Sequence, residues 1–546
     1  MKRARRALLV LLVLGSAGCQ RCARSEASLL DSIPGDASAV VLLQPLGAVA
    51  VALRGGMNLT QSQPEGAQAV EDLKQALGFD PTTVEGWQQA GLDPARPAAL
   101  VAVAGEPVWL LPMLDGPRVL ENARGLATKL WRADKVTQVQ VAGRSGLRLA
   151  RSFGDREVVL GLLVLDPASK LVLAANGDAG SEALGRVLAT QPAQSLARSA
   201  AFAEDRALVR QGAVLLWTQI GDQNTAPAQL QAVAKQVSGA VASLGVDKGA
   251  LWLEARARLR PEAAKESQAL LASQVKPPDL LRSASAEAVL LAAGSADVPR
   301  MLQRLEAERG RGDLDALARS VGLDLNRDVL GRLAGGLGVV LYLEDPAPLL
   351  RHLGSARRIG QVLGRVLQVE AVAELTPQGS DGALATLDTY FRERQLEPSA
   401  RSVAGGEVHT ASMAGSDGSH QDFHYAVREH HLLVGNAPAE RFDAWVQRRA
   451  GTAGGGLREG LSEGLRELLE AERGGRLYLS FRALADRLRQ LSDMPEFPDP
   501  ALRSTLVKAA GPLAALGQLA AHLQIEGDQL RLRLRVEAPS EPRTTP

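Results

Sequence analysis

The stretch Ala255-Arg-Ala-Arg-Leu-Arg-Pro-Glu-Ala263 sets aliphatic residues and arginines in alternation. A second stretch, Leu530-Arg-Leu-Arg-Leu-Arg-Val-Glu-Ala538, has the same alternation 275 positions later. A period of two is typical of a β-strand with one buried face, because successive side chains point to opposite faces. The two stretches therefore predict two strands, each closing one half of a duplicated chain.

Shorter segments of the two halves also match in the same order. The matching pairs are Leu77-Gly-Phe-Asp80 with Val321-Gly-Leu-Asp324, Leu171-Val-Leu-Ala-Ala-Asn176 with Leu432-Leu-Val-Gly-Asn436, and Ala213-Val-Leu-Leu-Trp217 with Arg476-Leu-Tyr-Leu-Ser480. We predict two tandem repeats, 29–272 and 280–537. They are joined by a linker at 273–279, whose Pro277-Pro278 suits a stiff connection.

The pattern of apolar residues indicates an α+β fold. Short strands are expected in a run at 136–142, 147–151, 158–165 and 171–174. Helices are expected at 118–131 and 181–189, and a long helix at 227–244. Strands that arrive in runs favour a mostly antiparallel or mixed sheet with packed helices over a doubly wound parallel sheet.

The composition excludes some classes of partner. The 546 residues carry a formal net charge of +1, and only 3% of them are aromatic. A nearly neutral chain has no field that draws it to nucleic acid, and few rings are available to stack on bases. We expect no nucleic-acid partner. Since no glycine-rich loop is followed by a phosphate-binding lysine, we also expect no cofactor.

The first residues have the layout of an export signal. Four basic residues, Lys2, Arg3, Arg5 and Arg6, precede the apolar run 7–14, and Gly15-Ser-Ala-Gly-Cys19 follows. The apolar run is shorter than the ~20 residues that span a bilayer. We predict a signal peptide at 1–18.

The small residues that end at Cys19 resemble the lipobox of bacterial lipoproteins. The resemblance implies cleavage before Cys19 and a lipid on Cys19, with 19–28 as the tether. Gln20 stands where an aspartate would signal retention in the inner membrane. The resemblance therefore implies an outer-membrane lipoprotein whose body faces the periplasm or the cell surface.

The body resembles duplicated, uncharacterised secreted bacterial proteins. Their repeat opens with a Pro-x-Asp turn and an apolar strand, which correspond here to Pro34-Gly35-Asp36 and 39–43. That family implies no chemistry. The polar, proline-containing tail at 538–546 is expected to be disordered.

Arginines of the two closing strands are candidate anion-binding residues. They share one face of each strand and could bind phosphate or carboxylate groups in a bidentate manner. The alternative is a solvated sheet face with acidic residues on the neighbouring strands. The candidates are Arg256, Arg258, Arg260, Arg531, Arg533 and Arg535.

Histidines gather between 409 and 431 and suggest a metal site. The candidate ligands are His409, His420 and His424. His420 and His424 are expected at a junction of loop and strand, where they would not share a helix face. The alternative is a polar hairpin of a surface sheet, and we expect no bound metal.

Two further motifs depart from the patterns they suggest. Gly460-Leu-Ser462-Glu-Gly464 matches a nucleophile elbow, but an elbow needs a strand before its serine, and a helix is expected here. Asp324-Leu-Asn326-Arg-Asp328 begins like a calcium loop, but it lacks the later glycine and glutamate. We predict no catalytic residue.

These observations predict a lipid-anchored protein of the cell envelope that acts by binding or scaffolding, without catalysis. Its expected partners are the membrane, through the lipid, and an envelope protein or anionic envelope polymer. Two alternatives stay open: a carrier of lipid or another hydrophobic ligand, and a hydrolase with an unrecognised carboxylate site.

Overall fold

The computed structural model describes residues 29–51, 77–129, 132–221, 231–247, 249–271, 276–298, 330–344, 366–414, 420–494 and 500–538, with 54, 71–72, 74–75 and 300. The signal peptide, Cys19 and the tail from 539 lie outside these residues. The chain divides into two compact units. Unit 1 holds residues 1–263 and 528–532, and unit 2 holds residues 264–527 and 533–546. The chain passes from unit 1 to unit 2 after residue 263, so the linker expected at 273–279 falls within unit 2.

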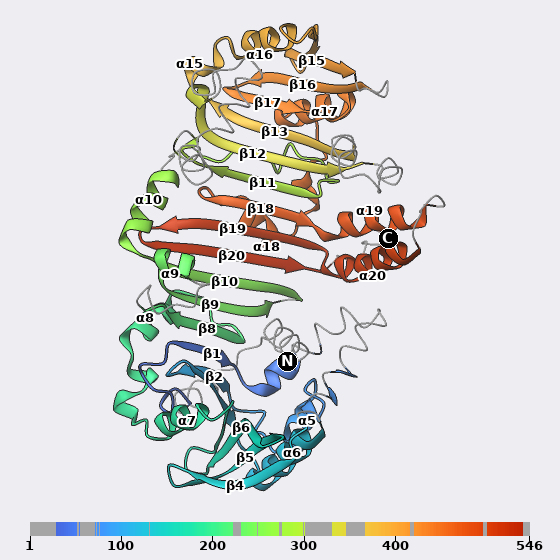
Figure 1. Cartoon of the computed structure of the whole chain (residues 1–546). Helices are drawn as coiled ribbons and strands as arrows, with labels where there is room; N and C mark the ends of the chain where they lie inside the picture. The colour runs from blue at the N-terminus through green and yellow to red at the C-terminus, as the bar shows by residue number, and fades with distance from the viewer. Residues whose placement is uncertain are drawn as a thin grey trace. The chain divides into compact units, whose positions relative to one another are not determined.

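The sheet of unit 1 is built outward from β1, which lies between β2 and β8. Pairing continues on one side through β3, β7, β6 and β5 to β4, and on the other through β9 to β10, always antiparallel (Figure 1). The strands are β1 (Ala39–Leu43), β2 (Ala98–Val103), β3 (Glu106–Pro112), β4 (Lys135–Val141), β5 (Arg144–Phe153), β6 (Arg156–Asp166), β7 (Leu171–Ala175), β8 (Val214–Gln219), β9 (Val237–Asp247) and β10 (Ala250–Leu259).

The sheet of unit 2 is built in the same way around β11, which lies between β12 and β18. Pairing continues through β13, β17, β16 and β15 to β14, and through β19 to β20, whose residues 529–532 are counted with unit 1 and 533–537 with unit 2. The strand order is that of unit 1 with ten added to each label. The strands are β11 (Leu290–Ser295), β12 (Leu333–Leu343), β13 (Leu367–Leu375), β14 (Ser399–Val403), β15 (Gly406–Ala414), β16 (His420–Arg428), β17 (His431–Gly435), β18 (Gly475–Ser480), β19 (Gln518–Glu526) and β20 (Gln529–Glu537).

Helices accompany both sheets, so the chain is an α+β protein, as the sequence predicts. In the earlier part of the chain they are α5 (Val84–Gln89), α6 (Gly116–Lys129), α7 (Gly180–Leu188), α8 (Ala200–Ala207), α9 (Gln231–Gln236) and α10 (Pro261–Leu271), with 3-10 turns η1 (Pro192–Gln194) and η2 (Leu196–Arg198). In the later part they are α15 (Pro377–Ser380), α16 (Ala383–Arg392), α17 (Ala439–Arg449), α18 (Glu463–Leu469), α19 (Phe481–Asp493) and α20 (Pro500–Leu516), with η6 (Leu330–Arg332) and η7 (Leu457–Gly460). Among the described helices, none is long and apolar enough to cross a membrane.

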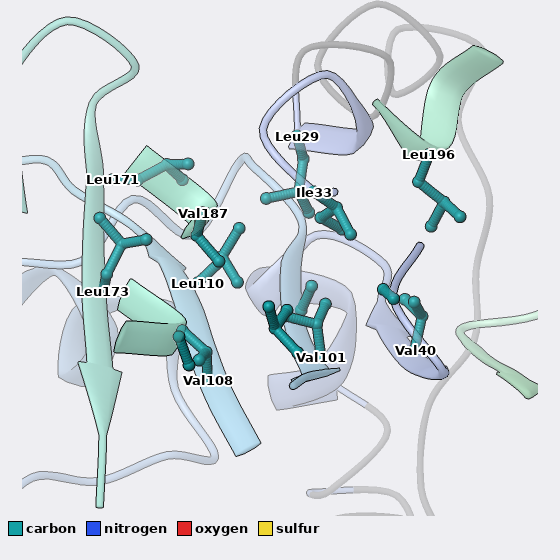
Figure 2. Close-up of a cluster of buried hydrophobic side chains, with 14 of the residues drawn as sticks. Leu29, Ile33, Val40, Val101, Val108, Leu110, Leu171, Leu173, Val187 and Leu196 are labelled. Carbon is teal, nitrogen blue, oxygen red and sulfur yellow. The ribbon is translucent and has the colours of Figure 1, made fainter. Parts of the chain in front are cut away.

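One hydrophobic core of unit 1 lies between the sheet and α7. Figure 2 shows Val187 of α7 among side chains from β1, β2, β3 and β7, with Leu29 and Ile33 from the segment before β1. Alternate residues of each strand point into this core, such as Val108 and Leu110 of β3. The spacing of Ala183, Leu184 and Val187 gives α7 a single apolar face, which explains why it packs there.

A second core covers the other face of the same strands. Val172 of β7 and Val214 of β8 pack there with Trp87 of α5 and Val119 of α6. The central strands are therefore buried on both faces, which explains why β1 and β7 read as continuous apolar runs and not as alternating ones.

The long helix expected at 227–244 is wrong. The structure has the short helix α9 at Gln231–Gln236 and then the strand β9 at Val237–Asp247. Strand pairing explains the difference, because β9 lies between β8 and β10 and pairs with both. Gly239, within the expected helix, also disfavours a helix interior, and the cross-strand contacts decide for the strand.

We predict that Leu110→Ala destabilises the protein by about 2–5 kcal/mol, because Leu110 is 0% exposed and its loss leaves a cavity between β3 and α7. Leu114→Ala is the matched control. Leu114 is 59% exposed, and its substitution should change the free energy of unfolding by less than about 0.5 kcal/mol. Urea unfolding followed by tryptophan fluorescence measures both values, and equal losses would contradict the assignment of this core.

Candidate functional site

Ionisable side chains lie in the interior of unit 2, on the face of the sheet that α17 covers. Tyr342 of β12, Glu370 of β13 and His424 of β16 are all buried. The pairing registers bring Glu370 opposite Gly435 of β17, and Gly435 opposite His424. Because Gly435 has no side chain, the ring of Phe442 from α17 packs directly over it.

Tyr342 and Glu370 form the centre of this polar interior. The Tyr342 hydroxyl donates to Glu370 Oε2 at 2.8 Å and accepts from the Ser285 backbone N–H at 3.1 Å. Glu370 is 0% exposed, and none of the residues that the structure describes bonds to its Oε1. Burial raises the pKa of Glu370 to about 7, although the Tyr342 hydrogen bond and the charges of Arg448 and Arg441 oppose the rise. Burial also raises the pKa of Tyr342.

Helix α17 closes the polar interior with both apolar and basic side chains. Phe442, Trp445 and Val446 are buried in the core of unit 2. Arg441 lies over the Tyr342 ring, with its guanidinium carbon 5.0 Å from the ring centroid. Its acceptors are Glu344, Gln368 Oε1 at 2.8 Å and Glu287 Oε2 at 2.7 Å. Arg448 Nε donates to the Ser283 carbonyl oxygen at 2.7 Å.

A second group of polar residues lies towards the edge strands. Asp388 of α16 accepts from Tyr425 at 2.6 Å and pairs with His409 Nδ1 at 2.9 Å. His409 Nε2 has no hydrogen-bond partner within the described ranges, and the Glu407 carboxylate lies 3.4 Å away. An aspartate and histidine pair can serve as a general base, but no hydroxyl or thiol of the described residues bonds to Nε2.

Ion pairing and hydrogen bonding also join α17 to β14 and β15. Arg401 of β14 makes a bidentate pair with Asp443, and its Nη2–Oδ1 distance is 2.6 Å. Thr410 lies beside Arg401 and is 2.8 Å from His424 Nδ1. Burial and the charge of Arg401 lower the pKa of His424, so this imidazole is neutral near pH 7. These contacts hold α17 on the sheet.

The candidate metal ligands do not converge in the part of the chain that the structure describes, where no group of three His, Cys, Asp or Glu could hold an ion. His409 pairs with Asp388, and His424 lies beside Thr410. His420 begins β16 opposite Ala414, and its side chain lies outside the described residues. The histidines of β15 and β16 belong to a hairpin, and His409 and His424 are buried in it, whereas the alternative expected them on a surface sheet.

The arginines of the closing strands are largely occupied by the protein itself. Arg256 and Arg258 of β10, and Arg260 directly after this strand, each donate to a protein oxygen, and so do Arg531 and Arg535. The acceptors are Leu208 O and Gln529 Oε1 for Arg256, Asp205 Oδ1 for Arg258, Ala234 O and Gly221 O for Arg260, Glu254 Oε1 for Arg531 and Glu537 Oε1 for Arg535. Arg533 differs, because its neighbours are His522 Nδ1 at 3.4 Å and Glu467 Oε1 at 3.5 Å.

Ser462 is the N-cap of α18, and its hydroxyl accepts from the Leu465 backbone N–H at 3.2 Å. This role explains the serine before an apolar helix without any catalytic chemistry. The segment 324–328, which begins like a calcium loop, lies outside the described residues, as does Cys19.

No motif of the sequence points to Tyr342, Glu370 or Asp388 as functional residues. One signal was present in the sequence of β13, Leu-Gln-Val-Glu-Ala-Val-Ala-Glu-Leu. Its alternation places Gln368 and Glu370 on the same face as Val372, a core residue. A glutamate in an inward register position predicts a buried carboxyl with a hydrogen-bond donor nearby.

The fold and the site together describe an α+β protein with antiparallel sheets and a polar interior in unit 2. No family model matches the chain, and no curated protein matches it. A solved structure, that of crystal form I of TP0453, is similar with a TM-score of 0.22 and 11% identity over 42% of this chain and 79% of that chain. A likeness of this size carries no argument about fold or function.

We predict that Glu370→Gln flattens the dependence of stability on pH. The folded state raises the pKa of Glu370 from 4.5 to about 7, so it holds the proton more tightly than the unfolded state. The resulting stabilisation is complete below about pH 4.5 and is lost as the pH rises through about 7. At one pKa unit for about 1.4 kcal/mol, the loss is on the order of 3 kcal/mol.

Urea unfolding between about pH 4.5 and 8 measures this effect. The Gln variant should lose less stability than the wild type over this range. Glu472→Gln, at an exposed residue of the same unit, should follow the wild-type profile. Parallel profiles for the wild type and Glu370→Gln would show that Glu370 does not titrate in this range.

Proposed function

We propose that this protein is a lipid-anchored component of the cell envelope, built from two repeats of one α+β fold, that acts by binding or scaffolding. The observation that carries the proposal is the layout of the first 19 residues. A basic segment, a short apolar run and small residues end at Cys19, which would become the lipid-bearing residue after cleavage. In this proposal the body faces the periplasm or the cell surface of the outer membrane.

The matching strand order of the two units supports their origin as tandem repeats. The segment before each first strand also forms the same contacts. Pro34 bridges to Ser195 in unit 1, and Ser285 bridges to Gly456 in unit 2. The backbone hydrogen bonds beside these bridges are 2.8 Å, from Leu196 to Ile33, and 2.7 Å, from Leu457 to Ala284.

The last hairpin of each sheet, β9–β10 and β19–β20, also corresponds. The number of positions between the two hairpins differs from the 275 that the arginine alternation suggests. Strands β10 and β20 begin at Ala250 and Gln529, each three positions after the end of the preceding strand. These starts are 279 positions apart, four more than the offset of 275. Because four is even, the alternation of faces is kept in both alignments.

Binding without catalysis is supported by the way the polar groups are used. In the described site, Arg401 pairs with Asp443 of α17, Arg448 of α17 donates to the backbone, and His409 pairs with Asp388 of α16, so these polar groups join helices to the sheet. A hydrolase would need a nucleophile beside the Asp388 and His409 pair. A carrier of a hydrophobic ligand would need an apolar cavity in one of the units.

We predict that Cys19→Ala abolishes lipid labelling of the protein and releases it from the membrane fraction. A clickable palmitate analogue supplied to the cells, followed by fractionation, measures both effects. Cys22→Ala is the matched control, because it removes the other cysteine of the chain and should leave labelling and fractionation unchanged. Labelling that persists in Cys19→Ala would contradict the anchor.

Crosslinking in intact membranes then tests the scaffolding role. We expect the wild type to capture one defined envelope protein and Cys19→Ala to lose it, because a tethered scaffold meets its partner at the membrane. Recovery of a co-purifying lipid with both forms, and of no protein, would instead support the carrier alternative.

A further inference from the structure

Three basic side chains lie in a row across β18, β19 and β20 of unit 2. Arg476 of β18 is the register partner of His522 of β19. His522 Nδ1 is 3.4 Å from Nη2 of Arg533 in β20. We propose that this basic row, Arg476, His522 and Arg533, binds a phosphate group, carried by a small molecule or by a lipid headgroup.

Arg476 has the strongest need for a ligand. It is only 7% exposed, and its Nε and Nη2 have no hydrogen-bond partner among the described residues. Burial lowers the pKa of this guanidinium, although the charges of Asp279 and Glu470 oppose the effect. A buried cation is unfavourable unless an anion and hydrogen-bond acceptors compensate for the lost water. A phosphate group supplies both the charge and several acceptor oxygens.

Arg533 offers a second guanidinium to the same ligand. Its Nε is also buried, and no group in the part of the chain that the structure describes bonds to it. His522 positions this arginine. The imidazole Nε2 lies 2.6 Å from the Arg473 carbonyl oxygen and therefore carries a hydrogen, which leaves Nδ1 as an acceptor towards Arg533 Nη2. We assign His522 as a positioning residue and the two arginines as the groups that contact phosphate.

The neighbouring carboxylates do not neutralise the row. Glu467 of α18 is 3.5 Å from Arg533 Nη1, but its side chain is 72% exposed. Glu470 pairs with Arg458, and Asp279 pairs with Arg282. An exposed pair such as Glu467 with Arg533 is weak, so phosphate can displace it at low cost.

The positions of unit 1 that correspond to the basic row carry no basic side chain. There β8 pairs Leu215 with Ser243 of β9, and Ser243 with Glu254 of β10. Val40 of β1 pairs with Trp217, and Leu291 of β11 pairs with Tyr478. Leu215 and Arg476 each stand two positions before these partners, so they occupy corresponding positions in the two units. Unit 1 therefore forms the same strand order without a basic residue at this position. The fold itself does not require the basic row of unit 2, so a ligand is needed to explain it. This inference names a ligand class for unit 2 and holds whether or not Cys19 carries a lipid.

Isothermal titration of the full chain with inorganic phosphate at constant ionic strength is the first test. We expect saturable binding to the wild type and a loss of affinity of at least about tenfold in Arg476→Leu, which introduces the residue type of unit 1. Arg473→Leu is the matched control. It removes an equal charge from an exposed neighbour and keeps the backbone carbonyl that His522 contacts, so binding should be unchanged.

Flotation with vesicles distinguishes the two sources of phosphate. If Arg476→Leu weakens binding to vesicles of phosphatidylcholine with phosphatidylglycerol, and free phosphate does not bind, the ligand is a lipid headgroup. Arg533→Gln gives an independent measurement if Arg476→Leu fails to fold, and it should weaken the same binding. Absence of both phosphate and vesicle binding in the wild type, or equal losses in Arg473→Leu and Arg476→Leu, would overturn the proposal.

Discussion

Burial of both faces of the central strands is the constraint on which the structure of unit 1 depends. Strands β1, β2, β3 and β7 point alternate side chains into two separate cores. A shift of one residue in any pairing would exchange the two sets and place each side chain in the wrong core. The register is therefore held from both sides, and helices α5, α6 and α7 can be short because each has a defined apolar surface to cover.

Much of this arrangement could be predicted from the sequence, because periodicity reports local burial. The strands expected at 136–142, 147–151, 158–165 and 171–174 are confirmed as β4 to β7, and the helix at 181–189 as α7. The helix at 227–244 was wrong because a long-range contact decided the outcome. Leu244 of β9 pairs with Val214 of β8, 30 positions earlier in the chain, and nothing local to 227–244 indicates that partner.

The polar interior of unit 2 was harder to foresee for a related reason. Glu370 is a single acidic residue in an apolar strand, and its partners Tyr342 and Arg448 are distant in the sequence. At the positions of unit 1 that the pairing registers match to Tyr342 and Glu370, the residues are Val103 and Val108, both buried. The same fold thus accepts either an aliphatic or a polar interior, and only the tertiary contacts show which groups compensate one another.

The composition of unit 1 has a consequence for how the protein forms. Residues 528–532, near the end of the chain, belong to unit 1, where Arg531 bonds to Glu254 and Leu259 donates to the Asp528 carbonyl oxygen at 2.7 Å. Nascent chains usually complete their N-terminal domain first as they emerge. Here the first unit stays unfinished until residues 528–532 have been made, long after residue 263, so a proteolytic cut that removes 528–532 would damage the unit whose other residues were synthesised earlier.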